Sequence, residues 1–126
     1  EAVYLALQRA PSHLARSKAA ELSAVEGVYW SMVDAAQAAL ITAGLLPPSP
    51  EHIPQMLKET FTDKGILKME LISWCRNIFE LHKGIIHGNI TQIKGVDIDM
   101  WQQRAEIFMR KMTELIDQFI EAQRKE

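Results

Sequence analysis

The chain has 126 residues, of which 48% are hydrophobic and 24% charged, so we expect one globular domain with a substantial core. Its formal charge of -2 excludes nonspecific binding of nucleic acid or of an anionic membrane through a chain-wide positive field. The single cysteine, Cys75, excludes an intrachain disulfide framework and a cysteine-rich zinc module, and is typical of a cytoplasmic protein. The apolar runs are too short for a membrane span or a signal-peptide core.

Apolar residues recur at spacings of three and four over most of the length, which predicts an all-α fold. We expect an up-and-down bundle of four main helices preceded by a short N-terminal helix over residues 1–10, which Pro11 interrupts. No Gly/Ser tract or internal repeat divides residues 1–126, so they form a single domain. The chain begins with Glu1 and not with methionine, which leaves open that it belongs to a longer chain.

The first main helix is expected to begin after Ser12 and to end at Gly44. Its inward stripe consists of Val25, Tyr29, Met32, Ala36, Ala39 and Ala43. Ser49 followed by Pro50 indicates the start of the second main helix, which ends near Asp63. Its inward anchors are Met56, Leu57 and Phe61.

The third main helix is expected over residues 68–83, with Gly84 ending it, and residues 84–96 are expected to form a loop. Asp99 and Gln102 have the spacing of a capping box, which predicts the start of the last helix. A heptad-like seam follows through Trp101, Ala105, Phe108, Met112, Leu115, Phe119 and Ala122.

The most informative stretch runs from Cys75 to Gly88. No acidic residue lies between Leu81 and Val96, whereas His82, Lys83, His87 and Lys94 all do. The sequence therefore predicts a local basic pocket at a helix end, on a protein that is otherwise slightly acidic.

Over roughly residues 12–120 the sequence resembles the HEPN family of helical domains. The resemblance rests on the helix Val28-Tyr29-Trp30-Ser31-Met32-Val33-Asp34-Ala35-Ala36-Gln37-Ala38-Ala39-Leu40, on the turn Gly-Leu-Leu-Pro-Pro-Ser-Pro-Glu-His after it, and on Arg76-Asn77 followed by a histidine. It implies a homodimer that binds RNA or nucleotide, a nucleotidyltransferase partner and a place in a toxin-antitoxin-like system. Active members of the family are metal-independent ribonucleases that use this arginine and histidine; others lack the activity.

Two registers of the motif are open. In one, Arg76-Asn77 is followed after four residues by His82. In the other, Ile85-Ile86-His87-Gly88 matches the end of the family motif, and His82 then stands where the family has arginine. Histidine cannot reproduce the fixed two-pronged contact of a guanidinium with phosphate, so this second register weakens the case for catalysis.

Helix geometry makes a dimer a condition of catalysis. Arg76 and His82 differ by about 240° around a helix axis and ~9 Å along it, so one subunit does not bring both to the same phosphate. A two-fold dimer could bring Arg76 of one chain to His82 or His87 of the other. A histidine would then act as base or acid and Arg76 would hold the phosphate, while Asn77 orients the substrate and Lys83 and Lys94 steer the RNA backbone.

Simpler roles compete with these assignments. His82 could be a core histidine on the stripe of Leu71, Cys75 and Ile78, and Arg76 could pair with Glu80 on the helix surface. No Glu-x-x-His or His-x-x-x-His pair and no glycine-rich phosphate loop occurs, so neither a metal nor a cofactor is expected. The rival hypothesis is a noncatalytic nucleotide- or protein-binding module that partners a nucleotidyltransferase.

Overall fold

The computed structural model describes residues 2–125, and they form helices joined by turns, which confirms the all-α prediction. The long helices are α1 (Ala2–Thr42), α3 (Met69–Ile86) and α4 (Gly95–Arg124). Between α1 and α3 lies one continuous, irregular helical segment made of η1 (Pro50–His52), α2 (Ile53–Leu57) and η2 (Lys58–Thr62). α2 contains about one and a half α-helical turns. The 3-10 turn of η1 precedes it and the π turn of η2 follows it.

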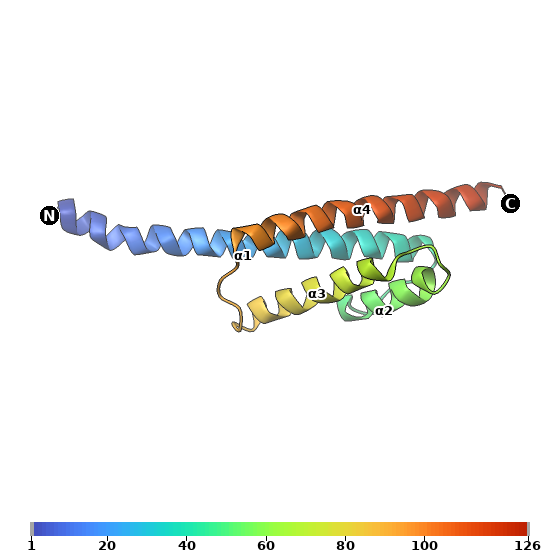
Figure 1. Cartoon of the computed structure of the whole chain (residues 1–126), viewed down its shortest axis with the longest axis horizontal. Helices are drawn as coiled ribbons and strands as arrows, with labels where there is room; N and C mark the ends of the chain where they lie inside the picture. The colour runs from blue at the N-terminus through green and yellow to red at the C-terminus, as the bar shows by residue number, and fades with distance from the viewer. Residues whose placement is uncertain (1, 126) are drawn as a thin grey trace.

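The arrangement differs from a simple up-and-down order. Figure 1 shows α1 and α4 side by side and running in the same direction, with α3 antiparallel to both and α2 beside α3. The contact between α1 and α4 is the most extensive one in the protein. In an up-and-down bundle the first and fourth helices would be antiparallel; here the proline-rich connection after Thr42 is not helical, and the second helical segment is short.

A separate N-terminal helix ending at Pro11 is not confirmed, because α1 continues through this residue. Proline has no N–H to donate to the carbonyl of Leu7, so the helix loses one hydrogen bond there without ending. Residues 2–20 are all exposed and project beyond the rest of the molecule (Figure 1).

The core lies between α1, α3, α4 and the α2–η2 segment, where the predicted anchors Leu57 and Phe61 are buried and Met56 is half-buried. On α1, Val25, Tyr29, Met32, Ala36 and Ala39 are buried as expected, and Ala43 is half-buried. On α4 the seam is buried from Trp101 to Leu115, whereas Phe119 is half-buried and Ala122 is exposed. The seam loses its cover because α4 extends past the end of α1 (Figure 1).

An arginine links α3 to α4. The guanidinium carbon of Arg104 lies 5.3 Å from the ring centre of Trp74 and 4.9 Å from that of Trp101. Both distances suit cation–π attraction, so this cluster holds the first half of α3 against α4.

Two predicted helix ends were wrong. α3 runs past Gly84 to Ile86, because the missing side chain of this glycine makes room for Ile90: a Cβ there would lie 2.6 Å from Ile90 Cδ1. The helix ends instead at Ile86, with His87 as the C-cap and then Gly88, whose φ of 76° is in the left-handed region. α4 begins at Gly95, so Asp99 lies inside the helix and does not cap it.

Candidate functional site

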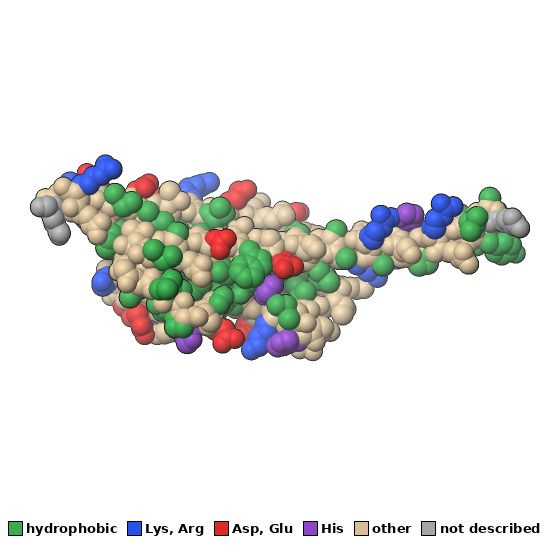
Figure 2. Space-filling view, turned by 180° about the vertical axis from the view of Figure 1, so that it is seen from behind, with side chains coloured by type: hydrophobic (Ala, Val, Ile, Leu, Met, Phe, Trp, Pro, Cys, Tyr) green, Lys and Arg blue, Asp and Glu red, His purple; other side chains and the backbone are tan. Residues whose placement is uncertain are grey.

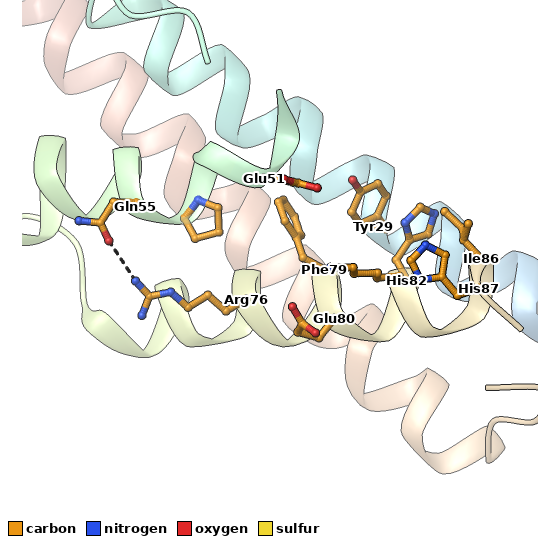
Figure 3. A pocket seen from close by; sticks show the side chains of 11 residues that line it. Tyr29, Glu51, Gln55, Arg76, Phe79, Glu80, His82, Ile86 and His87 are labelled. Carbon is orange, nitrogen blue, oxygen red and sulfur yellow. Dashed lines mark hydrogen bonds between the residues drawn. The ribbon is translucent and has the colours of Figure 1, made fainter. Parts of the chain in front are cut away.

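One face of α3 lines an open pocket of about 820 Å³, whose other walls come from α1 and from the η1–α2 segment (Figure 3). Its size lies within the range of small-molecule sites. The lining residues are Tyr29, Glu51, Pro54, Gln55, Arg76, Phe79, Glu80, His82, Lys83, Ile86 and His87. Arg76, His82 and His87, all predicted from the sequence as catalytic, therefore share one pocket.

The spacing along α3 explains why these side chains share a face. Arg76, Glu80, Lys83 and His87 follow one another at steps of four, three and four, which repeats one face of an α-helix. The extension of α3 past Gly84 to Ile86 makes this possible, because an earlier end would have directed His87 away from the row.

Arg76 lies toward one end of the pocket and the two histidines toward the other (Figure 3). The exposed guanidinium donates a hydrogen bond from Nη2 to Oε1 of Gln55 at 3.3 Å, so Arg76 is oriented by α2 and not by Glu80 as the helix-surface alternative supposed. Along the axis, Arg76 stands ~9 Å from His82 and ~16 Å from His87. One protomer therefore does not bring its arginine and either imidazole to a single phosphate.

His82 is buried and belongs to an aromatic cluster. Its ring stacks on that of Tyr29 with centroids 3.7 Å apart and planes 8° from parallel, and it meets the edge of Trp30 at 6.4 Å. Burial lowers the pKa of His82 below the usual value, and the carboxylate of Glu26 opposes part of this shift. His82 thus favours the neutral imidazole, which agrees with the alternative of a core histidine while leaving one edge on the pocket.

His87 has a different setting, because it is exposed at the C-terminal end of α3. Its backbone N–H donates to the carbonyl of Lys83 at 3.0 Å, and the N–H groups of Asn89 and Ile90 both donate to the carbonyl of Gly84. These bonds fold the chain back onto the helix end and fix where His87 stands. Its imidazole is the one that a ligand can reach freely.

The charge of the pocket is mixed. Arg76 and Lys83 contribute fixed positive charges, and Glu51 from η1 and Glu80 from α3 contribute negative ones. The prediction of a basic pocket considered only the chain between Leu81 and Val96, and these two carboxylates come from outside it. Burial raises the pKa of the Tyr29 hydroxyl, and the negative charge of Glu51 adds to this shift.

Two of the predicted binding residues lie away from this pocket. Asn77 is exposed on another face of α3, and Lys94 directly precedes α4; neither lines the cavity. Conversely, Tyr29, Glu51, Gln55 and Phe79 line the pocket but were not predicted as site residues. Only the spacing of Phe79, three residues after Arg76, could have indicated its place.

The described residues offer no alternative centre for metal chemistry. Among residues 2–125, no three His, Cys, Asp or Glu side chains gather as metal ligands would.

Cys75 is fully buried, and burial raises the pKa of its thiol to about 12. None of the helices described has the length and apolar character needed to span a membrane.

Comparisons of the chain with family models, with curated proteins and with solved structures found no match.

Proposed function

We propose that this chain is a HEPN-type cytoplasmic domain whose pocket binds RNA or a nucleotide. The observation that carries the proposal is that Arg76, Lys83 and both histidines line one cavity beside the exposed Ile86 and the half-buried ring of Phe79. Cations and imidazoles recognise phosphate, and flat apolar surface accepts a base, so the pocket offers both elements that a nucleotide requires.

The phosphate-binding part consists of Arg76, Lys83 and His87. Arginine presents a planar fork that suits phosphate oxygens, and Gln55 holds this fork at one end of the pocket (Figure 3). Arg76 and Lys83 are ~10 Å apart along α3, so they fit different phosphates of a short chain better than a single one. These contacts position a backbone and read no base.

The base-binding part consists of Phe79, Ile86 and the edge of the stack formed by Tyr29 and His82. Phe79 packs against Tyr29 with ring centroids 5.0 Å apart, which fixes its orientation, and Ile86 is well exposed. A base on the half-buried ring of Phe79 would gain part of the about 1–3 kcal/mol that stacking on an aromatic face supplies, whichever base is bound.

Metal-independent cleavage of RNA is the catalytic form of this proposal, and it requires a second protomer. Arg76 of one subunit would stabilise the phosphate, while His87 of the other, the exposed imidazole, would exchange the proton of the ribose hydroxyl or of the leaving oxygen. A toxin-like role with a nucleotidyltransferase partner belongs to this form.

A second candidate is the noncatalytic module that binds nucleotide or a nucleotidyltransferase partner. Two observations favour it: His82 is held in the aromatic cluster, and Glu51 and Glu80 offset the charges of Arg76 and Lys83. A pocket of this kind suits a nucleotide with few phosphates better than a long polyanion.

Incubation with a structured RNA in excess chelator separates the two candidates. The catalytic form predicts cleavage that Arg76→Ala or His87→Ala abolishes and that His13→Ala, a histidine outside the pocket, leaves intact. The module predicts intact RNA and a nucleotide affinity that Arg76→Ala lowers. Absence of both cleavage and binding in the wild type would contradict the proposal as a whole.

A further inference from the structure

Two hydrogen bonds connect a carboxylate outside the pocket to the arginine inside it. Gln55 Nε2 donates to Glu59 Oε1 at 2.9 Å, and Gln55 Oε1 accepts from Arg76 Nη2 at 3.3 Å. Gln55 and Arg76 line the pocket, whereas Glu59 does not. These three side chains come from η2, α2 and α3, and their two hydrogen bonds are here called the amide bridge.

The bond to Glu59 decides which end of the Gln55 amide meets Arg76. A glutamine amide has an oxygen that only accepts and a nitrogen that only donates, and a guanidinium has only donors. Because Glu59 holds the nitrogen, the oxygen faces α3 and accepts from Arg76. If the amide turned over, its N–H groups would meet those of the arginine, and no hydrogen bond would form. Glu59 therefore acts on Arg76 through the orientation of Gln55.

Arg76 has a competing partner on its own helix. Glu80 lies four residues later, a spacing at which opposite charges pair on a helix surface, and both side chains are exposed. Among residues 2–125, Arg76 nevertheless forms no ion pair with Glu80, and Figure 3 shows its guanidinium directed toward Gln55 and away from that carboxylate. Figure 2 shows that carboxylates and cations lie close together on this face of the bundle. An arginine paired with Glu80 would offer less positive charge to an incoming phosphate.

We propose that Glu59 is a positioning residue of the pocket. By orienting Gln55, it holds Arg76 away from Glu80 and in place for a phosphate. Gln55 accepts from one N–H group of the guanidinium, so the remaining donors are left for a ligand. An arginine that is held in place before binding loses less conformational entropy when the ligand arrives. The inference rests on the proposed function, since it concerns the arginine of the same pocket.

Removal of Glu59 tests the proposal, because the amide bridge and simple electrostatics predict opposite results. Loss of a carboxylate near an anion site makes the local potential more positive, which by itself would raise the affinity for RNA. The amide bridge predicts the reverse: Glu59→Ala is expected to weaken binding of a short labelled RNA roughly two- to tenfold, the effect of one hydrogen bond. Glu51→Ala is the matched control. It removes a carboxylate of the pocket that is not part of the amide bridge, and it is expected to bind more tightly than the wild type.

Two further variants separate positioning from a general structural effect. Glu59→Gln keeps an oxygen that accepts from Gln55 but removes the charge, so it is expected to match or exceed the affinity of the wild type. In a Glu80→Gln background Arg76 has no carboxylate at helical spacing, so Glu59→Ala is expected to lower the affinity less than it does in the wild type. An affinity that rises in Glu59→Ala as it does in Glu51→Ala, or an equal loss in Glu59→Gln, would overturn the proposal.

The side chain of Arg76 can also be followed without a ligand. NMR relaxation of its Nε–Hε group is expected to show an ordered side chain in the wild type and in Glu59→Gln, and a mobile one in Glu59→Ala. Arg110, which is exposed and outside the amide bridge, is expected to be mobile in all three proteins. Equal mobility of Arg76 in the wild type and in Glu59→Ala would overturn the amide bridge. A wild type with an ordered Arg76 that binds no RNA would overturn the proposed function and support the amide bridge.

Discussion

The ring of His82 lies flat on the ring of Tyr29, with centroids 3.7 Å apart and planes only 8° from parallel. This contact joins α3 to α1 at the wall of the pocket. It explains why one of the two candidate histidines is a poor proton carrier, because the same burial that permits the stack lowers its pKa.

The stability of the protein is expected to depend on pH through His82. Its pKa is lower in the folded than in the unfolded state, so above about pH 6.5 both states are neutral and its contribution is fully present. Below that pH the unfolded state takes up a proton first, and the free energy of unfolding falls. Urea denaturation at several pH values measures this slope. His82→Phe keeps a ring on Tyr29 without a titrating group, so its slope between neutral and mildly acid pH is expected to be smaller; an equal slope would contradict the assignment.

Cys75 is expected to resist thiol reagents in the native protein. Only the thiolate reacts, and burial raises the pKa of this thiol to about 12, so almost none is ionised at neutral pH. Labelling with a chromogenic disulfide reagent is expected to be complete in denaturant and very slow without it. A Gln103→Cys variant supplies an exposed thiol on α4 for comparison, which is expected to react at once; rapid labelling of both thiols would show that α3 opens readily.

Gly84 and Ile90 are expected to be energetically coupled. Alanine at position 84 would gain about 1 kcal/mol of helix propensity, but its Cβ would lie 2.6 Å from Ile90 Cδ1 and 3.0 Å from Cγ1. Forcing such overlap costs about 1–3 kcal/mol, so Gly84→Ala alone is expected to be neutral or destabilising. In an Ile90→Ala background the overlap is gone and Gly84→Ala is expected to stabilise by about 1 kcal/mol. Additive effects in this double-mutant cycle would mean that Ile90 does not pack on the helix.

Substitution of a core side chain gives a reference value for these changes in the free energy of unfolding. Phe108 is fully buried in the seam between α4 and α1, and Phe108→Ala is expected to cost about 3–5 kcal/mol by thermal or urea denaturation. Phe119→Ala, on the same seam where α4 loses its cover, is the matched control and is expected to cost clearly less. Equal losses would place the end of the core further along α4 than the structure does.

Local sequence patterns were sufficient for the buried faces of the long helices, but not for all of their ends or for their arrangement. The stripe from Val25 to Ala39 and the seam from Trp101 to Leu115 are periodic, and periodicity directly reports which face is buried. The direction of α4 relative to α1 depends on the proline-rich connection and the short segment from Pro50 to Thr62, and neither carries a periodic signal long enough to read.

The same distinction applies to the pocket. Arg76, Lys83 and His87 could be predicted because they lie within one short stretch and at helical spacing. Glu51 and Gln55 could not, since they reach the pocket from a segment more than twenty residues earlier, and only the packing of α2 on α3 brings them there. The end of α3 was misplaced for a related reason: Gly84 is required by a contact with Ile90, not by a turn.

The central claim is that the cavity lined by Arg76 and Lys83 binds nucleotide phosphate, and a titration measures it directly. Fluorescence anisotropy of a short labelled RNA is expected to give saturable binding by the wild type, weakened roughly ten- to one-hundred-fold by Arg76→Ala because a charge-assisted hydrogen bond of about 1.5–3 kcal/mol is lost. Arg110→Ala, which removes an exposed arginine outside the pocket, is expected to bind as the wild type does. Equal loss of affinity in both variants, or no saturable binding by the wild type, would contradict the claim.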